Sequence, residues 1–356
     1  MSKLLNEERR QGLAPEAALS IGAVARATPV NVIVGRLPEK GKLHMHALSL
    51  AKRAEVVAHL VEGSGVRATS RLLNVHRDTI TRLLALLGEG CDRLHARLVR
   101  DLNVTYIEAD ELHSFVHTRA KNLRPGALEE HGEQWVWIAL ARSSKVVLSY
   151  RVGRRDEQNA RAFMLDLRSR LNTIPVLCTD AFNAYPAAVE EAFAGSVDYS
   201  QVVKSFTGRR NAKDYDKVAP ANGPPMVSKR VVYGAPDLSK CSTSIAEREM
   251  LSIRTHLRRF VRRGTGFSKC LRNHRAAISL FVSWYNLCRV HKSLRVTPGM
   301  QVGITNRVWS IEELIEAALA AEPFDAPAPE PLKIRDGSGP ARALPRGGFL
   351  RLVKSA

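Results

Sequence analysis

The feature that most restricts the fold of this chain is a change in hydrophobic spacing near residue 104. Before it, apolar residues recur at helical spacing, and after it they alternate as they do in strands. The segments predicted from there on are strands at 104–116, 134–141 and 145–152, a helix at 157–171, a buried strand at 174–179, a helix at 187–193 and a strand at 197–206. This order predicts an α/β protein whose mixed sheet is flanked by helices.

Helices are predicted on both sides of this region, at 48–61, 67–73, 77–87, 244–263 and 271–288. A last helix begins at Ser310, with Glu313 in the capping-box position. Residues 207–242 are expected to be irregular. The predicted division is a poorly patterned extension (1–44), a helix-turn-helix domain (45–100), a catalytic domain (101–300), a C-terminal helix (301–322) and a disordered basic tail (323–356).

The segment 67–87 has the pattern of a helix-turn-helix motif, in which Asn74 provides the turn. Residues that face outward from its second helix can reach phosphates and base edges, and they are His76, Arg77, Thr79 and Arg82. An ordinary helical hairpin with a solvated basic face is the alternative reading.

The charge balance favours a nucleic-acid partner. The chain has 54 Lys and Arg against 35 Asp and Glu, a net charge of +19. Such an excess is typical of proteins that bind a polyanion, and it argues against an ordinary acidic metabolic enzyme. No apolar run reaches the length of a membrane span, so we expect no membrane partner. We expect the protein to be cytoplasmic and associated with the nucleoid. The five cysteines form no CxxC pair, which predicts free thiols rather than a zinc site.

Three acidic residues fall where separate elements could bring them together. Asp110 lies on the first strand, Asp180 ends the buried strand, and Glu247 lies in the first turn of the helix that begins near Ser244. Ligands of open α/β sheets gather at the carboxyl ends of strands, and converging carboxylates suit Mg²⁺ or Mn²⁺. Each residue also has a plain alternative, as the end of a strand, the start of a loop or a capping-box partner of Ser244.

Basic residues surround Glu247. Between Arg248 and Arg295 there are 12 Lys or Arg residues and one acid, Glu249. On a continuous helix, Arg254 and Arg258 would share the side of Glu247. A face so uneven in charge favours a passing phosphate backbone over a solvated surface. The residues expected to bind DNA here are Arg254, Arg258, Arg262, Lys269, Arg289 and His291.

Taken together, these segments resemble the insertion sequence one family of transposases, over about residues 48–322. The matching motifs are Ala109-Asp110-Glu111 with Ser114-Phe115-Val116, Thr179-Asp180 with Ala184-Tyr185, Thr243-Ser244 with Glu247-Arg248, Phe267-Ser268-Lys269, and the stretch from Tyr285 to Pro298. His113, Ala181 and Met250 stand where the family often has Trp, Gly and Asn.

The resemblance implies a ribonuclease H-like core with a catalytic Asp-Asp-Glu triad, here Asp110, Asp180 and Glu247, holding Mg²⁺ or Mn²⁺, with two ions expected. It also implies that the N-terminal region binds the terminal inverted repeats of a mobile element. Cleavage at the element end would free a 3′-hydroxyl, which then attacks target DNA. Bringing two ends together implies a homo-oligomer. The alternatives are a non-catalytic regulator or decayed copy, a nuclease of the same fold, and an RNA-associated basic protein.

Overall fold

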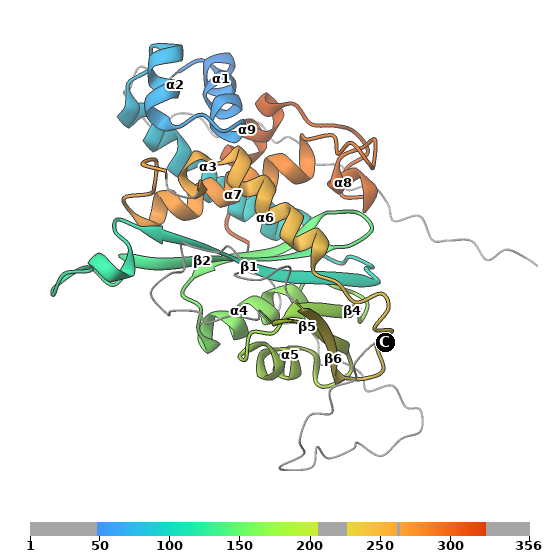
Figure 1. The fold of residues 1–356 in the computed structure, drawn as a ribbon. Coiled ribbons are helices and arrows are strands. Elements are labelled where there is room, and N and C mark those ends of the chain that lie inside the picture. Colours follow the sequence, from blue (N-terminus) through green and yellow to red (C-terminus); the bar gives the residue numbers. More distant parts are fainter. Residues whose placement is uncertain (1–47, 206–225, 262–263, 325–356) are drawn as a thin grey trace, which may run out of the picture.

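A computed structural model describes residues 48–205, 226–261 and 264–324. The predicted N-terminal extension at 1–44 and nearly all of the basic tail lie outside the described residues, as does Arg262. The centre of the molecule is one sheet, with helices packed on both of its faces (Figure 1).

The sheet has six strands: β1 (Tyr106–Val116), β2 (Gly132–Ala141), β3 (Val147–Gly153), β4 (Val176–Asp180), β5 (Asp198–Ser205) and β6 (Met226–Tyr233). Their spatial order is β3-β2-β1-β4-β5-β6. The first three strands form an antiparallel meander, and β4 and β5 then run parallel to β1. This confirms the predicted fold class at the level of an α/β mixed sheet flanked by helices.

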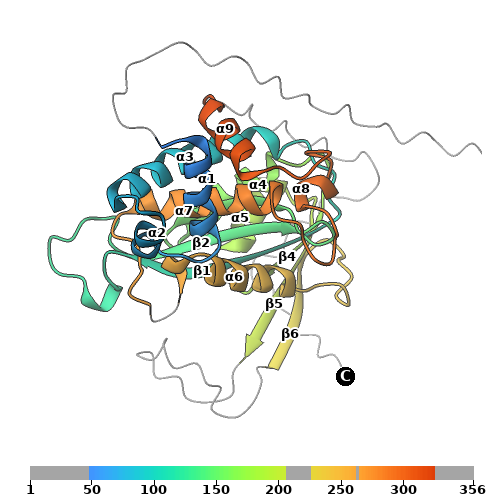
Figure 2. The same ribbon diagram turned by 90° about the horizontal axis from the view of Figure 1, so that it is seen from above.

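The strand β6 corrects the prediction that residues 207–242 are irregular. It pairs antiparallel with β5 and forms the edge of the sheet. Sequence periodicity missed it because three polar residues in a row, Ser228 to Arg230, interrupt its apolar pattern. Lys229 and Arg230 instead have polar partners, the carbonyl of Leu238 and the side chain of Gln201. Figure 2 shows β5 and β6 extending together beyond the helices.

Alternating residues of β1 serve two hydrophobic cores, as the pleat of a strand requires. Ile107 and Ala109 pack with α4 (Glu157–Arg168) and α5 (Tyr185–Phe193). Leu112 faces the other side, which is covered by α6 (Ser244–His256) and α7 (Leu271–Leu287). The strand at the centre of the sheet is therefore fixed from both faces.

Three helices precede the sheet: α1 (Leu50–Val61), α2 (Val66–Leu73) and α3 (Arg77–Leu98). Asn74 ends α2 with a left-handed backbone, φ 52°, as predicted for the turn before α3. Helix α3 runs 11 residues past its predicted end at 87, because its second half is buried against α7 and α9. The remaining helical segments are α8 (Pro298–Gln301), α9 (Ile311–Ala320) and the short 3-10 turns η1 (Ala120–Asn122) and η2 (Arg258–Phe260). Ser310 and Glu313 form the predicted capping box of α9.

Helix α6 is shorter than predicted. It was expected to continue to residue 263, but it ends at His256, and Leu257 has an extended backbone. The turn η2 follows, so that Leu257 and Phe260 are both buried in the core. The guanidinium of Arg254 donates to the carbonyl of Phe260 at 3.1 Å and so helps to hold this bend.

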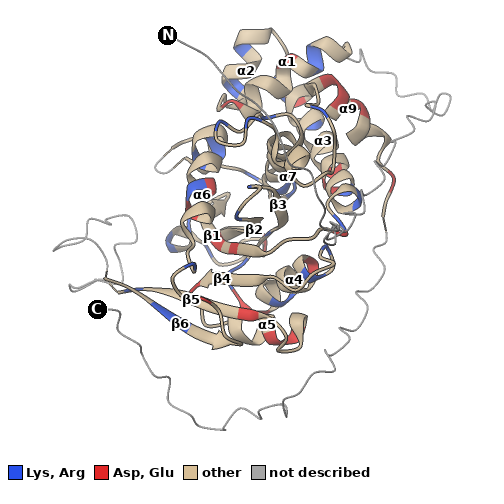
Figure 3. Ribbon diagram, turned by 90° about the vertical axis from the view of Figure 1, so that its right-hand side faces the viewer, with Lys and Arg blue, Asp and Glu red and all other residues tan. Residues whose placement is uncertain are grey.

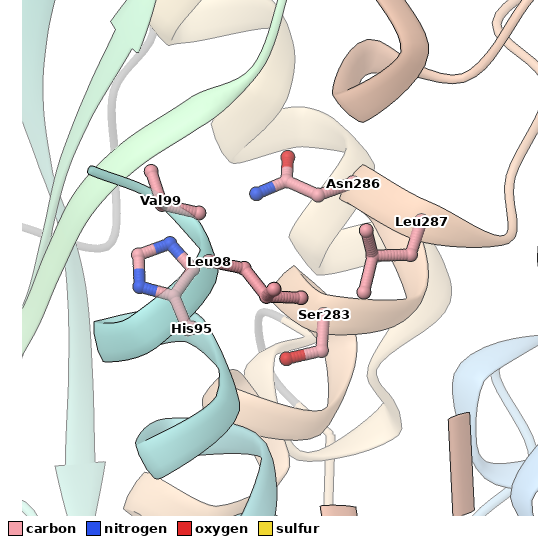
Figure 4. A pocket seen from close by; sticks show the side chains of 6 residues that line it. All are labelled: His95, Leu98, Val99, Ser283, Asn286 and Leu287. Carbon is pink, nitrogen blue, oxygen red and sulfur yellow. The ribbon is translucent and has the colours of Figure 1, made fainter. Parts of the chain in front are cut away.

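Polar side chains attach the helical layer to edge strand β3. The amide of Asn286 on α7 bonds both backbone groups of Val147, at 3.0 and 2.9 Å, and a ring nitrogen of His95 lies 3.1 Å from the same carbonyl. Figure 4 shows His95 and Asn286 directed into one small pocket between α3 and α7. Burial lowers the pKa of His95 to about 3, so its ring is neutral there.

The close approach of α3 and α7 depends on the absence of a side chain at Gly88. A Cβ at this position would lie 2.4 Å from the Cα of Ala276 and 2.6 Å from its carbonyl oxygen. Alanine normally favours a helix over glycine, but this clash is with backbone and cannot be relieved by a rotamer change. We therefore expect Gly88→Ala to lower the free energy of unfolding by about 1–3 kcal/mol.

Urea denaturation followed by circular dichroism would measure this change. Leu86→Ala, at an exposed position of the same helix, serves as the control and should leave the midpoint almost unchanged. A midpoint for Gly88→Ala at or above that of the wild type would contradict the packing described here.

Candidate functional site

The parallel pairing of β1 with β4 creates an acidic cluster. Ala109 pairs with Thr179, so Asp110 and Asp180, the next residue on each strand, lie side by side on two neighbouring central strands. Carboxylate oxygens of Asp110, Asp180 and Glu111 lie within 4.8 Å of one another. The structure thus brings two of the three predicted acids together and adds Glu111, the next residue along β1, whose side chain leaves the opposite face of the strand.

Burial and mutual repulsion disfavour ionisation in this cluster. Burial, followed by the charge of Asp180, raises the pKa of Asp110 to about 7, and Glu247 adds to the increase. Burial also raises the pKa of Glu111 and that of Asp180. A group of buried acids with raised pKa values is typical of metal and catalytic sites.

Arg155 partly balances the acidic cluster. Its Nη2 lies 3.1 Å from Oδ2 of Asp180 and 3.6 Å from Oε2 of Glu111. The other oxygen of Asp180 accepts from the backbone N–H of Phe182 at 3.0 Å. The sequence reading missed Arg155, because 25 residues separate it from Asp180 and only the fold brings them together.

Glu247 is close enough to raise the pKa of Asp110, but it has its own partners. Its Oε1 accepts a hydrogen bond from the hydroxyl of Thr243 at 2.7 Å and forms an ion pair with Lys204 of β5. Thr243, not Ser244, is the N-cap of α6, so the capping-box alternative for Glu247 and Ser244 is wrong. Lys204 is a second residue of the site that the sequence reading did not identify.

Glu108 has a structural function on the same face as Asp110. It is 1% exposed, and its Oε2 accepts from the backbone N–H groups of Ile245 and Ala246 at 2.7 and 3.2 Å. The other oxygen accepts from Nε of Arg142 at 2.9 Å. Glu108 therefore binds the N-terminus of α6 to β1 and fixes the position of Glu247, which lies in the same first turn of the helix.

The acidic cluster fits a divalent cation. Oε1 of Glu111 is buried without a hydrogen bond of normal length to the residues that the structure describes, and the hydroxyl of Tyr185 lies near this carboxylate. Hard oxygen ligands of this kind suit Mg²⁺ and Mn²⁺. Asp110, Asp180 and Glu111 are the residues that could hold the ion. Figure 3 shows acidic residues on β1 and mixed charges on α6, which lies beside it.

The four residues expected to contact DNA from the helix-turn-helix segment lie at the start of α3. His76 is its N-cap, and the side chains of His76 and Arg77 are 69% and 63% exposed. Arg82 is exposed, and Thr79 is partly buried. The four side chains thus occupy the beginning of one helix, whereas Ile80 and Leu84 of the same helix are buried.

The basic residues after Glu247 do not form one helical stripe. Arg258 lies in η2, so its predicted alignment with Glu247 on α6 is wrong. Arg254 donates to the carbonyls of Phe260 and His113, and Arg289 lies over the rings of Trp284 and Tyr285. Lys269 and Arg258 are exposed, and His291 is partly buried, with its Nδ1 3.0 Å from the hydroxyl of Ser293.

Two further expectations concern the whole chain. All five cysteines are free thiols, as predicted. Among the described residues, no helix combines the length and apolarity needed to cross a bilayer.

No family model and no curated protein matches this sequence. Among solved structures, the chain is similar to the Mos1 strand transfer complex, with 16% identity and a TM-score of 0.18 over 44% of this chain and 58% of that one. It is also similar to a mariner Mos1 paired end complex with Mg, with 15% identity and a TM-score of 0.18 over 45% and 61%. A pre-cleavage Mos1 transpososome matches with 12% identity and a TM-score of 0.24 over 80% and 83%. The chain spans less than two thirds of the Mos1 chains in the first two of these structures.

The raised pKa of Asp110 predicts how pH affects stability. Because the folded protein holds this pKa at about 7, above its ordinary value of 3.8, protonation favours the folded state. This contribution is fully present below about pH 4 and is lost as the pH rises to about 7. We therefore expect Asp110→Asn to raise the melting temperature at pH 8 in EDTA, and to have little effect at pH 4.

Thermal melts at both pH values would test this, with Glu316→Gln, at an exposed position of α9, as the control. Addition of Mg²⁺ at pH 8 should raise the melting temperature of the wild type more than that of Asp110→Asn. Equal melting temperatures for Asp110→Asn and the wild type at pH 8 would show that the carboxylates do not repel one another as described.

Proposed function

We propose that this protein is a DNA transposase of the Asp-Asp-Glu class, with Asp110, Asp180 and Glu247 as its catalytic residues. The observation that carries the proposal is the acidic cluster formed where β4 ends beside the middle of β1, because its buried, mutually repelling carboxylates call for a cation. Glu247 lies beside this cluster on a helix fixed to β1 by Glu108. The motif resemblance and the net charge of +19 support a DNA substrate.

Asp110 and Asp180, with Glu111 beside them, would hold Mg²⁺ or Mn²⁺, and we propose two ions in the active complex. When bound, such ions activate an attacking water or hydroxyl and stabilise the leaving oxygen of a phosphodiester. Glu247 would join them once Lys204, its present partner, turns to a DNA phosphate. Arg155 would keep Asp180 in position through its ion pair.

The DNA would be held by residues on several elements. We propose that His76, Arg77, Thr79 and Arg82 at the start of α3 bind the terminal inverted repeats of the element. Arg254, Arg258, Arg262, Lys269, Arg289 and His291 would contact the DNA backbone near the acidic cluster. Joining two ends to a target requires a homo-oligomer, and the prokaryotic nucleoid is the proposed location.

Asp180→Asn tests the catalytic part of the proposal. The amide keeps the shape of the side chain but removes its charge, so we expect loss of strand transfer by at least 100-fold, while binding to DNA ends changes little. The assay uses purified protein, labelled DNA from both flanks of the gene, a target plasmid and Mg²⁺, with nicked and joined products scored separately.

Asp237→Asn is the matched control, because Asp237 is an exposed aspartate on a loop. If the Asp180→Asn variant joins DNA at the rate of the wild type, the assignment of Asp180 as a catalytic residue is wrong. Specific binding by the wild type with neither nicking nor joining would favour the non-catalytic regulator, and nicking without joining would favour a nuclease of the same fold.

A point substitution on α3 tests recognition of the ends without disturbing the fold. Deletion of the N-terminal helices is unsuitable, since Leu87 and Leu94 belong to the same core as α7. We expect Arg77→Ala to weaken specific binding about tenfold, because one Arg contact to a base edge is worth about 1–3 kcal/mol. Fluorescence anisotropy with the end sequence and with scrambled DNA would measure the change.

Arg161→Ala on α4 is the control, since its side chain is 62% exposed, close to the 63% of Arg77. If both variants bind the end sequence as tightly as the wild type, Arg77 has no role in recognition.

A further inference from the structure

The face of the sheet that carries Glu111 continues past the acidic cluster. Three residue pairs follow one another on this face: Glu111 with Trp137, His113 with Trp135, and Phe115 with Glu133. The first pair is covered, since Trp137 is fully buried against Phe163 and Phe182. The side chains of His113 and Glu133 are 46% and 52% exposed. Figures 1 and 2 show the β1–β2 hairpin extending beyond α4 and α5.

Aromatic rings and cations alternate on the uncovered part of this face. The guanidinium of Arg155 lies 5.2 Å from the centre of the Trp135 ring, and the His113 ring meets Trp135 edge to face at 5.0 Å. Arg155 is the residue that also pairs with Asp180. The aromatic surface therefore begins at the acidic cluster itself.

The far end of this face has the same character. The ring of Phe115 lies 5.0 Å from that of Phe267, Arg119 lies over Phe115 at 5.5 Å, and Nζ of Lys269 lies over Phe267 at 3.7 Å. We define the aromatic strip as Trp135, Phe115 and Phe267 together with the cations Arg155, Arg119 and Lys269. Along β1, the distance from Glu111 in the acidic cluster to Phe115 in the strip is about 13 Å.

A buried hydrogen-bond network holds the outer end of the strip in place. Ser268, between Phe267 and Lys269, forms a bridge with Val116, and its carbonyl accepts from the N–H of His117 at 2.8 Å. The ring of His274 lies 2.8 Å from the hydroxyl of Ser268 and 2.9 Å from that of Ser114. Phe267 and Lys269 are thus attached to β1 before any ligand arrives.

We propose that the aromatic strip binds a single-stranded segment of DNA that leads into the acidic cluster. Phe115, Trp135 and Phe267 are each partly buried. Bases of a single strand can stack on the accessible part of such rings, whereas bases inside a duplex are already stacked. Each ring has a cation beside it that can meet a phosphate, which favours nucleic acid over an apolar protein partner. The inference rests on the proposed function, because a strand at this position would be one that the active site has separated.

Glu133 opposes this ligand and so sharpens the test. Its carboxylate lies 3.6 Å from Nε2 of His113, in the middle of the strip. A phosphate placed there would meet its negative charge. Removal of that charge should tighten binding, whereas a change that merely damaged the fold would weaken it.

The experiment measures binding of a labelled 12-residue oligothymidylate by fluorescence anisotropy in EDTA, so that no catalysis is needed. We expect Trp135→Ala to weaken binding about tenfold and Trp135→Phe to restore most of it, since stacking needs only a ring. Glu133→Gln should tighten binding about threefold. Lys269→Ala should weaken it more than Arg307→Ala, a control at an exposed cation in the segment between α8 and α9.

An oligonucleotide with abasic sites separates stacking from charge. The wild type should bind it about tenfold more weakly than oligothymidylate, and Trp135→Ala should bind both alike. Equal affinities of the wild type for the two oligonucleotides, or an unchanged affinity of both Trp135→Ala and Glu133→Gln, would overturn the inference.

The strand-transfer assay keeps this inference distinct from the proposed function. If the wild type joins DNA and these substitutions do not change its affinity for single-stranded DNA, the proposed role of the aromatic strip is wrong and the transposase proposal stands. If the affinities respond as expected and the wild type neither cleaves nor joins DNA, the strip stands as a binding site and the proposed function is wrong.

Discussion

The parallel pairing of β1 with β4 is the interaction on which the candidate site depends. It places Asp110 and Asp180 side by side, so their negative charges repel each other when both are ionised. The repulsion can be tolerated because both strands are held elsewhere. Antiparallel β2 covers the length of β1, and β4 lies between two parallel neighbours in the middle of the sheet. The acidic cluster is thus built on the most strongly paired part of the fold.

One strand also sets the position of the remaining parts. On one face of β1, Glu108 binds the N-terminus of α6 and so determines where Glu247 lies. On the other face, Glu111 contacts Arg155, whose guanidinium covers Trp135. The pleat of a strand separates these two faces. However, β4 ends at Asp180, and in the space beyond that end side chains from both faces of β1 can approach one another. This explains why an acid from each face, Asp110 and Glu111, has an oxygen within the same 4.8 Å cluster.

The sequence predicts the parts of this arrangement that follow local rules. Asp180 could be identified because it ends a short apolar strand, and Asn74 because a turn between helices favours a left-handed residue. Arg155 and Lys204 could not, since neither forms a local pattern and each meets its acid only through the tertiary fold. The predicted end of α6 is wrong for a similar reason. Tertiary burial of Leu257 and Phe260 overrides a helical pattern that continues in the sequence.

The buried acids also connect stability with function. In the protein without a cation, the folded state keeps Asp110 partly protonated near neutral pH, since its pKa is about 7. A ligand that requires ionised carboxylates must therefore displace protons, and its binding energy adds to the stability of the fold. Arg155 and Lys204 lessen the repulsion before that ligand arrives. Arg155 forms ion pairs with Asp180 and Glu111, and Lys204 forms one with Glu247. Because the side chain of Glu247 is 42% exposed, Lys204 can move from it to a phosphate at small cost, and the charge that Glu247 then regains favours a metal ion beside it.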